Sequence, residues 1–263
     1  MRRAVHCIFV IAPFVAIPEK DCYKRRNEKD AVSIPNSTHN TQQKMLKIGH
    51  RGAKGHVAEN TIASFQKAID LGCDGVELDV HICQSGEVVV IHDDSIDRTT
   101  TAKGSVKDLN FSELHQHQIP SLLSVLDLIN NRICVNIEIK SADCAQKILD
   151  ITDYYIRKKN WNTNNFIISS FNWTILSAIY QGNPKLKIAV LTADSIEKAV
   201  NFAKKINAFA INPYYELLNQ DNVTLMHQNG FKIFAWTVNE LSAIEKMKCL
   251  LIDAIISDYP ERI

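Results

Sequence analysis

Three carboxylates stand within two short apolar segments of the chain. In GVELDV, Glu77 and Asp79 alternate with valine and leucine, and in VNIEIK Glu138 alternates with isoleucine in the same way. Successive side chains of a strand point to opposite faces, so these acids would share the polar faces of two strands. Carboxylates that converge on one place repel one another unless a cation lies among them. Since oxygen ligands suit hard divalent ions, the three acids predict a site for Mg²⁺ or Ca²⁺.

Cationic and imidazole side chains follow the same apolar segments. His50 and Arg51 come directly after the run KIG, Lys140 ends the segment VNIEIK, and His92 follows the run EVVVI. Imidazole titrates near neutral pH, which suits acid–base transfer, and the guanidinium of Arg51 offers a planar fork for phosphate oxygens. A metal ion, Arg51, Lys140 and two histidines together predict phosphoryl chemistry.

These residues also have a purely structural interpretation. Arg51 and Lys140 would neutralise the carboxylates in an ion network that holds no metal, since such networks also perturb acidic groups. A single histidine is more often structural than catalytic. Position favours a functional site, because all of these residues fall at the C-terminal ends of predicted strands, where barrels assemble active sites.

From Lys47 onward, segments of strand length alternate with segments of helical period, which is typical of βα units around a parallel sheet. One helical pattern is NTIASFQKAIDLG, in which Asn60 is expected to be the N-cap. Eight strands are predicted, at residues 47–50, 75–80, 133–139, 166–170, 187–191, 208–211, 232–238 and 254–257. The pattern predicts an α/β fold, a (β/α)8 TIM barrel of about 217 residues. A doubly wound open sheet is the alternative, although no G-x-G-x-x-G or Walker-type loop supports it.

A ninth apolar run, EVVVI, follows the second strand after only a tight turn at residues 84–86. That turn is too short for the crossover that parallel neighbours require, so the run is predicted to fold back as one arm of a β-hairpin. The arm would return His92 towards the level of Glu77 and Asp79. Residues 95–119 would then form a short insertion after the second strand and its hairpin.

The bulk composition excludes some classes of function. The chain has 263 residues, of which 46% are hydrophobic and 22% charged, as in ordinary globular proteins. Its net charge of +1, without a basic block in the main body, argues against nucleic-acid binding. The cysteine count is odd and no C-x-x-C spacing occurs. This pattern predicts buried thiols in a reducing compartment, rather than disulfides or structural zinc, at Cys73, Cys83, Cys134 and Cys144.

Residues 1–46 are predicted to be an N-terminal extension, and residues 47–263 to form the barrel domain. The extension has a basic start and an apolar stretch, Ala4–Ile17, too short to span a bilayer but as long as a signal-peptide core. It lacks a clean small-x-small cleavage site, so a secretory signal and a plain extension both stay open. A cytoplasmic location is expected first, with a periplasmic or secreted one as the alternative. Membrane association and oligomeric state are left open.

The motifs resemble those of the glycerophosphodiester phosphodiesterases, within the larger barrel group that includes the phosphatidylinositol-specific phospholipases C. HRG, ENT, ELD, HDD and EIK occur in this order at the family's spacing, and the likeness continues more loosely through ISSFNW, FAWTVN and IISDYP. It covers residues 48 to about 260. The resemblance implies a phosphoric diester hydrolase that acts on a small-molecule glycerophosphodiester with a divalent metal, Mg²⁺ or Ca²⁺, as its cofactor.

The same resemblance implies roles for individual residues. Glu77, Asp79 and Glu138 correspond to the family's metal ligands, and His50 and His92 to its acid–base pair.

Four further positions correspond to substrate contacts. Arg51 and Lys140 would contact the phosphate, and Glu59 stands where the family keeps the glutamate of ENT near the site. Trp236 would wall the glycerol pocket, with a plain core aromatic as the alternative. Ala58 departs from the proline that the family usually has in P-E-N-T, which loosens the approach to Glu59 without removing any chemistry.

The expected reaction yields sn-glycerol 3-phosphate and an alcohol such as choline or ethanolamine. One alternative is a phosphodiesterase that acts on a lysophospholipid or another lipid phosphodiester. Another is a non-catalytic barrel that binds a phosphodiester, although every key position is intact. The sequence does not distinguish attack by the 2-hydroxyl from attack by water, nor the acid from the base.

Overall fold

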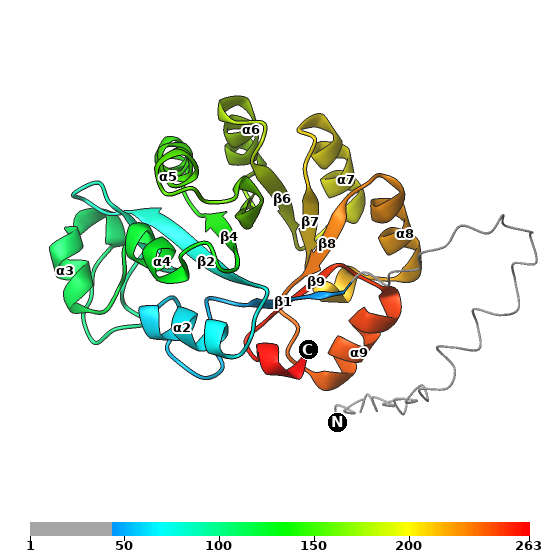
Figure 1. The fold of residues 1–263 in the computed structure, drawn as a ribbon, viewed down its shortest axis with the longest axis horizontal. Helices are drawn as coiled ribbons and strands as arrows, with labels where there is room; N and C mark the ends of the chain where they lie inside the picture. Colours follow the sequence, from blue (N-terminus) through cyan, green and yellow to red (C-terminus); the bar gives the residue numbers. More distant parts are fainter. Residues whose placement is uncertain (1–43) are drawn as a thin grey trace, which may run out of the picture. The chain divides into compact units, whose positions relative to one another are not determined.

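The computed structural model describes residues 44–263, and these form a closed barrel of eight parallel strands. β1 pairs in parallel with both β2 and β9, which closes the barrel (Figure 1). The predicted (β/α)8 barrel is therefore confirmed. Its strands are β1 (Leu46–Gly49), β2 (Gly75–Ile82), β4 (Cys134–Ile139), β5 (Phe166–Ser170), β6 (Lys187–Thr192), β7 (Ala210–Pro213), β8 (Lys232–Ala235) and β9 (Ala254–Ser257).

Helices cover the outside of the strands and bury their apolar stripes against the barrel (Figure 1). The α-helices are α2 (Ile62–Asp70), α3 (Phe111–Gln116), α4 (Leu122–Ile129), α5 (Cys144–Lys158), α6 (Trp173–Gly182), α7 (Ile196–Lys205), α8 (Gln220–Gln228) and α9 (Leu241–Leu250). The 3₁₀ helices are η1 (Val106–Asp108), η2 (Thr163–Asn165), η3 (Tyr215–Leu217) and η4 (Pro260–Arg262). Within residues 44–263, none of the helices has the length and apolar character needed to cross a bilayer.

The interior of the barrel changes from apolar to polar along its axis. Inward side chains such as Ile48, Ile167 and Phe234 form a small apolar core of their own. Towards the C-terminal ends of β2 and β4, the inward positions carry acids instead, and Asp79 lies directly opposite Glu138 in the parallel register. Because side chains alternate along each strand, the acids share the inner face of the barrel with this apolar core and lie nearer to the C-terminal strand ends.

The predicted hairpin is present. β3 (Val88–Val90) pairs antiparallel with the end of β2, with Val80 opposite Val90. The following insertion has its own apolar cluster, which fixes it against the hairpin and consists of Cys83, Val89, Ile91, Ile96, Val106, Leu114 and Ile119.

The structure differs from the sequence-based expectations at the start of α2 and at the end of β8. The N-cap of α2 is Thr61, whose hydroxyl accepts from the amide of Ser64, and not Asn60, which has a left-handed φ of 57°. The strand expected at residues 232–238 ends at Ala235, and Trp236 beyond it forms only an isolated parallel bridge to Tyr214, with its amide on the carbonyl of Pro213 over 3.2 Å. Expectations about residues 1–43 lie outside the described residues.

The predicted burial of the thiols is largely confirmed. The side chains of Cys73, Cys83 and Cys144 are buried, whereas that of Cys134 is partly exposed.

Candidate active site

Glu77, Asp79 and Glu138 form a buried acid cluster at the C-terminal end of the barrel. Each offers one carboxylate oxygen, and these three atoms all lie within 4.8 Å of one another. β2 supplies two of the acids and β4 the third, and the register of these neighbouring strands brings them together. Three buried oxygen donors at this spacing fit a hard divalent cation.

The charge of the acid cluster is only partly balanced by its neighbours. Lys140 Nζ lies 2.6 Å from Glu138 Oε1 and 2.9 Å from Asp79 Oδ1, and Arg51 Nε lies 3.4 Å from Asp79 Oδ2. Burial and the repulsion between the acids raise the pKa of Glu77 well above its ordinary value and that of Glu138 to about 7. For Asp79, the effect of burial is outweighed by Lys140 and Arg51, which lower its pKa. Two cations face three carboxylates, and a bound divalent ion would relieve the remaining repulsion.

His50 is held at one side of the acid cluster by a carboxylate. Its Nδ1 lies 2.6 Å from Asp258 Oδ1, and its Nε2 lies 3.9 Å from Glu77 Oε2. An ionised carboxylate only accepts hydrogen bonds, so Nδ1 carries the proton and Nε2 faces the acids. Burial lowers the pKa of His50, although the hydrogen bond to Asp258 acts in the opposite direction. Asn239 in turn donates to Asp258 Oδ2 over 2.9 Å.

His92 repeats this arrangement on the hairpin side of the site. Its Nδ1 lies 2.6 Å from Asp93 Oδ1, and its backbone carbonyl lies 3.1 Å from Nε2 of His81. Burial lowers the pKa of His92 despite its hydrogen bond to Asp93. Its side chain is 34% exposed, so this imidazole is reached from solvent more easily than His50.

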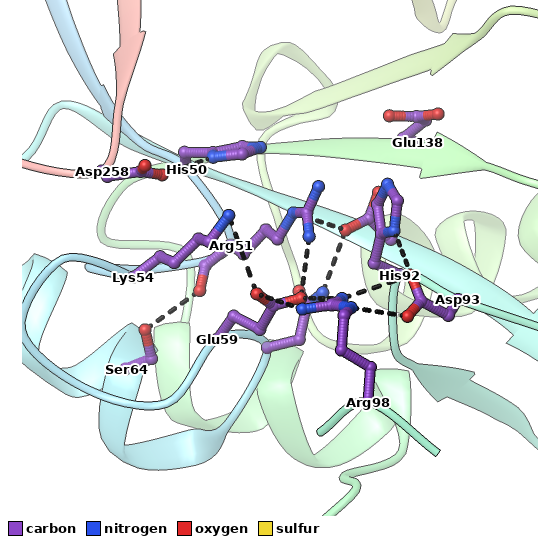
Figure 2. A network of polar contacts seen from close by, with 12 residues as sticks. His50, Arg51, Lys54, Glu59, Ser64, His92, Asp93, Arg98, Glu138 and Asp258 are labelled. Atoms are coloured by element: carbon purple, nitrogen blue, oxygen red, sulfur yellow. Dashed lines mark hydrogen bonds and ion pairs between the residues drawn. The ribbon is translucent and has the colours of Figure 1, made fainter. Parts of the chain in front are cut away.

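Arg51 joins the acid cluster to a second layer of charges (Figure 2). Its backbone amide donates to Glu77 Oε2 over 3.1 Å, and its Nη1 donates to Glu59 Oε1 over 2.7 Å. Arg51 has a φ of 49°, in the left-handed region, and Gly52 follows with 85°. Burial alone would raise the pKa of Glu59, but hydrogen bonds from Arg98 and Arg51 lower it to about 2. Lys54 Nζ lies 3.7 Å from the same carboxylate.

Comparisons with known proteins show the family of the chain. The model of the glycerophosphoryl diester phosphodiesterase family matches residues 50–262. The chain belongs to this family. Its sequence is 36% identical to a glycerophosphodiester phosphodiesterase of Caldanaerobacter subterraneus subsp. tengcongensis, over 83% of this chain and 96% of that protein.

Two solved structures extend the likeness to the fold. The glycerophosphodiester phosphodiesterase of Thermotoga maritima has a TM-score of 0.73 and 30% identity, covering 83% of this chain and 96% of the other. A phosphodiesterase of Oleispira antarctica, in complex with the product sn-glycerol-3-phosphate, has a TM-score of 0.74 and 25% identity, covering 82% and 94%. The chain is thereby identified as a phosphodiesterase of the glycerophosphoryl diester family.

Contacts in the structure connect eight of the nine residues that the sequence indicated. Ion pairs link Asp79, Glu138, Lys140, Arg51 and Glu59, whereas Glu77 contacts the amide of Arg51 and Nε2 of His50. His92 joins this network through Asp93 and Arg98. Trp236 lies in an aromatic cluster beyond the end of β8, where it packs against Phe171 and Tyr214. A part in substrate binding therefore stays a prediction for Trp236.

Sequence reasoning missed the partners of the functional side chains. Asp258 and Asp93 orient the two imidazoles, Arg98 bonds both Asp93 and Glu59, and Asn60 donates to Asp79 Oδ2 over 2.9 Å. Asp93 had a signal in its position directly after His92. The others lie in irregular segments, where no alternation or helical period indicates which way a side chain points.

A cavity of about 290 Å³ adjoins the site on the insertion side. Its lining includes Glu59, His92, Thr99, Thr100 and His117. Glu59 and His92 therefore connect the contacts of Arg51 to this cavity, which lies between residues 58–61 and the insertion.

Proposed function

We propose that this chain hydrolyses glycerophosphodiesters to sn-glycerol 3-phosphate and a free alcohol. The observation that carries the proposal is the buried acid cluster, whose ligand atoms lie within 4.8 Å of one another, in a site that also holds two carboxylate-paired histidines. The name of the family and those of the relatives agree with this reaction.

Glu77, Asp79 and Glu138 would hold the divalent ion, and Mg²⁺ or Ca²⁺ suits their oxygen donors. When bound, such an ion would draw charge from a phosphate oxygen and lower the pKa of a nearby hydroxyl. Asn60 and Lys140 keep Asp79 in place through their hydrogen bonds and ion pairs.

His50 and His92 would perform the proton transfers. Each has its Nδ1 on a carboxylate, which leaves Nε2 as the nitrogen for the reaction. One imidazole takes a proton from the attacking hydroxyl, and the other gives a proton to the oxygen of the leaving alcohol. Over the whole reaction, the phosphorus–oxygen bond to the alcohol breaks, and water supplies the hydroxyl that ends on phosphorus and the proton that ends on the alcohol.

The cations of the site would bind and stabilise the phosphate. Arg51, with Nη1 fixed by Glu59, presents a guanidinium whose remaining donors suit phosphate oxygens. Lys140 adds a second positive charge next to Glu138. Both cations would stabilise the negative charge that develops on phosphorus. Trp236 would wall the glycerol pocket.

A substrate panel tests this proposal. The purified chain is freed of metal with a chelator and then assayed with Mg²⁺ or Ca²⁺ on glycerophosphocholine, glycerophosphoethanolamine and lysophosphatidylcholine. We expect release of choline or ethanolamine from the glycerophosphodiesters only after metal is restored. Higher kcat/KM on lysophosphatidylcholine would replace the proposal by a lipid phosphodiesterase, and binding without turnover would indicate a non-catalytic barrel.

A further inference from the structure

Arg98, from the insertion after the hairpin, bridges two carboxylates of the site (Figure 2). Its Nε donates to Asp93 Oδ2 over 2.6 Å, and its Nη2 to Asp93 Oδ1 over 3.2 Å. Nη2 also donates to Glu59 Oε1 over 2.7 Å, and Nη1 to Glu59 Oε2 over 3.1 Å. One guanidinium therefore forms two bidentate pairs, an arrangement that fixes direction as well as charge.

Each of these carboxylates also holds a side chain of the proposed reaction centre. Asp93 Oδ1 lies 2.6 Å from Nδ1 of His92, and Glu59 Oε1 accepts from Nη1 of Arg51 over 2.7 Å. Arg98 thus stands in the middle of a continuous chain of contacts that joins an imidazole to a phosphate-binding guanidinium.

The backbone around Arg98 is well anchored. Ile96 is buried in the small core of the insertion, and its amide donates to the carbonyl of Gly104 over 3.0 Å. The amide of Thr100 closes a turn onto the carbonyl of Ile96, and Asp97 accepts from the amide of Gly104 over 2.9 Å. The insertion therefore provides a rigid base for the guanidinium.

We propose that Arg98 is a positioning residue for both sides of the site. It fixes Asp93, so that His92 keeps its proton on Nδ1, and it fixes Glu59, so that Arg51 is held in place for the phosphate. This inference rests on the proposed function. Arg98 is 47% exposed, although its partner Glu59 is only 9% exposed, so its removal is expected to change the site strongly and the stability of the fold modestly.

Steady-state kinetics provide the first test. In Arg98→Ala, we expect kcat/KM on glycerophosphocholine to fall about 10- to 100-fold, with a lower kcat through His92 and a higher KM through Arg51. Arg98→Lys should recover little, because an ammonium group cannot form the double fork. Arg157→Ala is the matched control: it removes an exposed arginine–aspartate pair of α5, with Nε 2.6 Å from Asp153, and should leave the kinetics unchanged. The melting temperatures of these variants should differ by about 3 °C.

A second readout does not depend on turnover. Imidazole ¹⁵N and ¹H NMR signals of His92, in protein with labelled histidine, should show the Nδ1–H tautomer in the wild type and a mixture of tautomers in Arg98→Ala. Unchanged kinetic constants together with an unchanged His92 tautomer would overturn the inference. If the wild-type chain does not cleave glycerophosphodiesters, the proposed function fails, and the NMR comparison still decides whether Arg98 positions His92.

A double-mutant cycle tests the bridge itself. Glu59→Gln and Asp93→Asn should be coupled in the wild-type background, with a combined change in kcat/KM that departs from the product of the single changes by more than about twofold. In the Arg98→Ala background the two effects should multiply independently. Equal coupling in both backgrounds would show that the two sides communicate by another route.

Discussion

The two histidines of the site share the same partner chemistry and differ in what supports it. Nδ1 of His50 and Nδ1 of His92 each lie 2.6 Å from an aspartate oxygen. His50 is only 13% exposed, and its partner Asp258 comes from a strand end 208 residues away. His92 is 34% exposed, and its partner is the next residue in the chain. One geometry is thus produced by barrel closure and the other by local sequence.

This difference determines what each imidazole depends on. β1 pairs with β9, and that pairing places His50 beside Asp258 at the seam of the barrel. His92 depends on the hairpin and on Arg98 in the insertion, both of which lie near it in sequence. Damage to the pairing of β1 with β9 should therefore affect His50 first, whereas damage to the insertion should affect His92 and the contacts of Glu59 with Arg51 together.

Removal of either imidazole is expected to have the largest effect. His50→Ala and His92→Ala should each lower kcat on glycerophosphocholine by about 10² to 10⁴-fold, because one proton transfer then lacks its group. Circular dichroism should show a folded barrel in both variants. Near-full activity in either variant, measured at saturating metal, would show that this histidine takes no part in the reaction. The two histidine–aspartate pairs would then not have equivalent roles.

Changing the two aspartates should separate the pairs. Asp258→Asn is expected to lower kcat about 10- to 100-fold, because an amide no longer fixes the tautomer of buried His50. Asp93→Asn should lower it less, about three- to tenfold, since water can reach the more exposed His92 and replace part of the contact. The kcat values of the two variants, measured at the same pH, provide the comparison. A larger loss in Asp93→Asn would mean that exposure does not decide how much each imidazole depends on its carboxylate.

The ion pairs of Glu59 with Arg51 and Arg98 should also make the free energy of unfolding depend on pH. The pKa of Glu59 is lowered from 4.5 to about 2, so its ion pairs stabilise the folded state fully above pH 4.5 and are lost as the pH falls towards 2. Urea unfolding should show a loss on the order of 2 kcal/mol over this range that Glu59→Gln does not show. Glu197→Gln, which changes an exposed acid of α7, is the control and should follow the wild type. A wild-type curve parallel to that of Glu59→Gln would contradict the lowered pKa.

The fold was largely predictable because a barrel repeats one simple pattern. Eight apolar runs of strand length are each seen in the structure, and the tight turn at residues 84–86 is enough to identify β3 as a hairpin arm. Errors occur where tertiary contacts replace local preference. Asn60 has a side chain suited to capping, but it donates to buried Asp79 instead, and Thr61 caps the helix.

The site residues on strands could be predicted from the sequence, but the residues that hold them in position could not. Alternation along β2 and β4 identifies the acid cluster, because a strand determines where each side chain points. Asp258, Asn239 and Arg98 lie in loops, and their contacts depend on how the barrel closes and how the insertion packs. Neither arrangement follows from local sequence.

A loss as small as that of Asp93→Asn is expected for Asn239, the residue that holds Asp258. Asn239 donates to Asp258 Oδ2 over 2.9 Å, and its Oδ1 accepts from the amide of Asp258 over 2.9 Å and from Ser257 Oγ over 3.0 Å. Asn239→Ala should lower kcat only about three- to tenfold, because His50 still holds the other carboxylate oxygen. KM should change little, since no phosphate contact is altered.

Gln146→Ala is the matched control for this variant, since it removes an amide–carboxylate hydrogen bond of 2.8 Å on the exposed face of α5. Its kcat should equal that of the wild type. If Asn239→Ala instead loses as much activity as Asp258→Asn, the orientation of the Asp258 carboxylate depends on Asn239. The pairing of β1 with β9 would then not be enough to position His50. If Asn239→Ala loses no activity, the position of Asp258 at the end of β9 is enough to orient His50. The hydrogen bonds of Asn239 would then contribute nothing to the pair of His50 and Asp258.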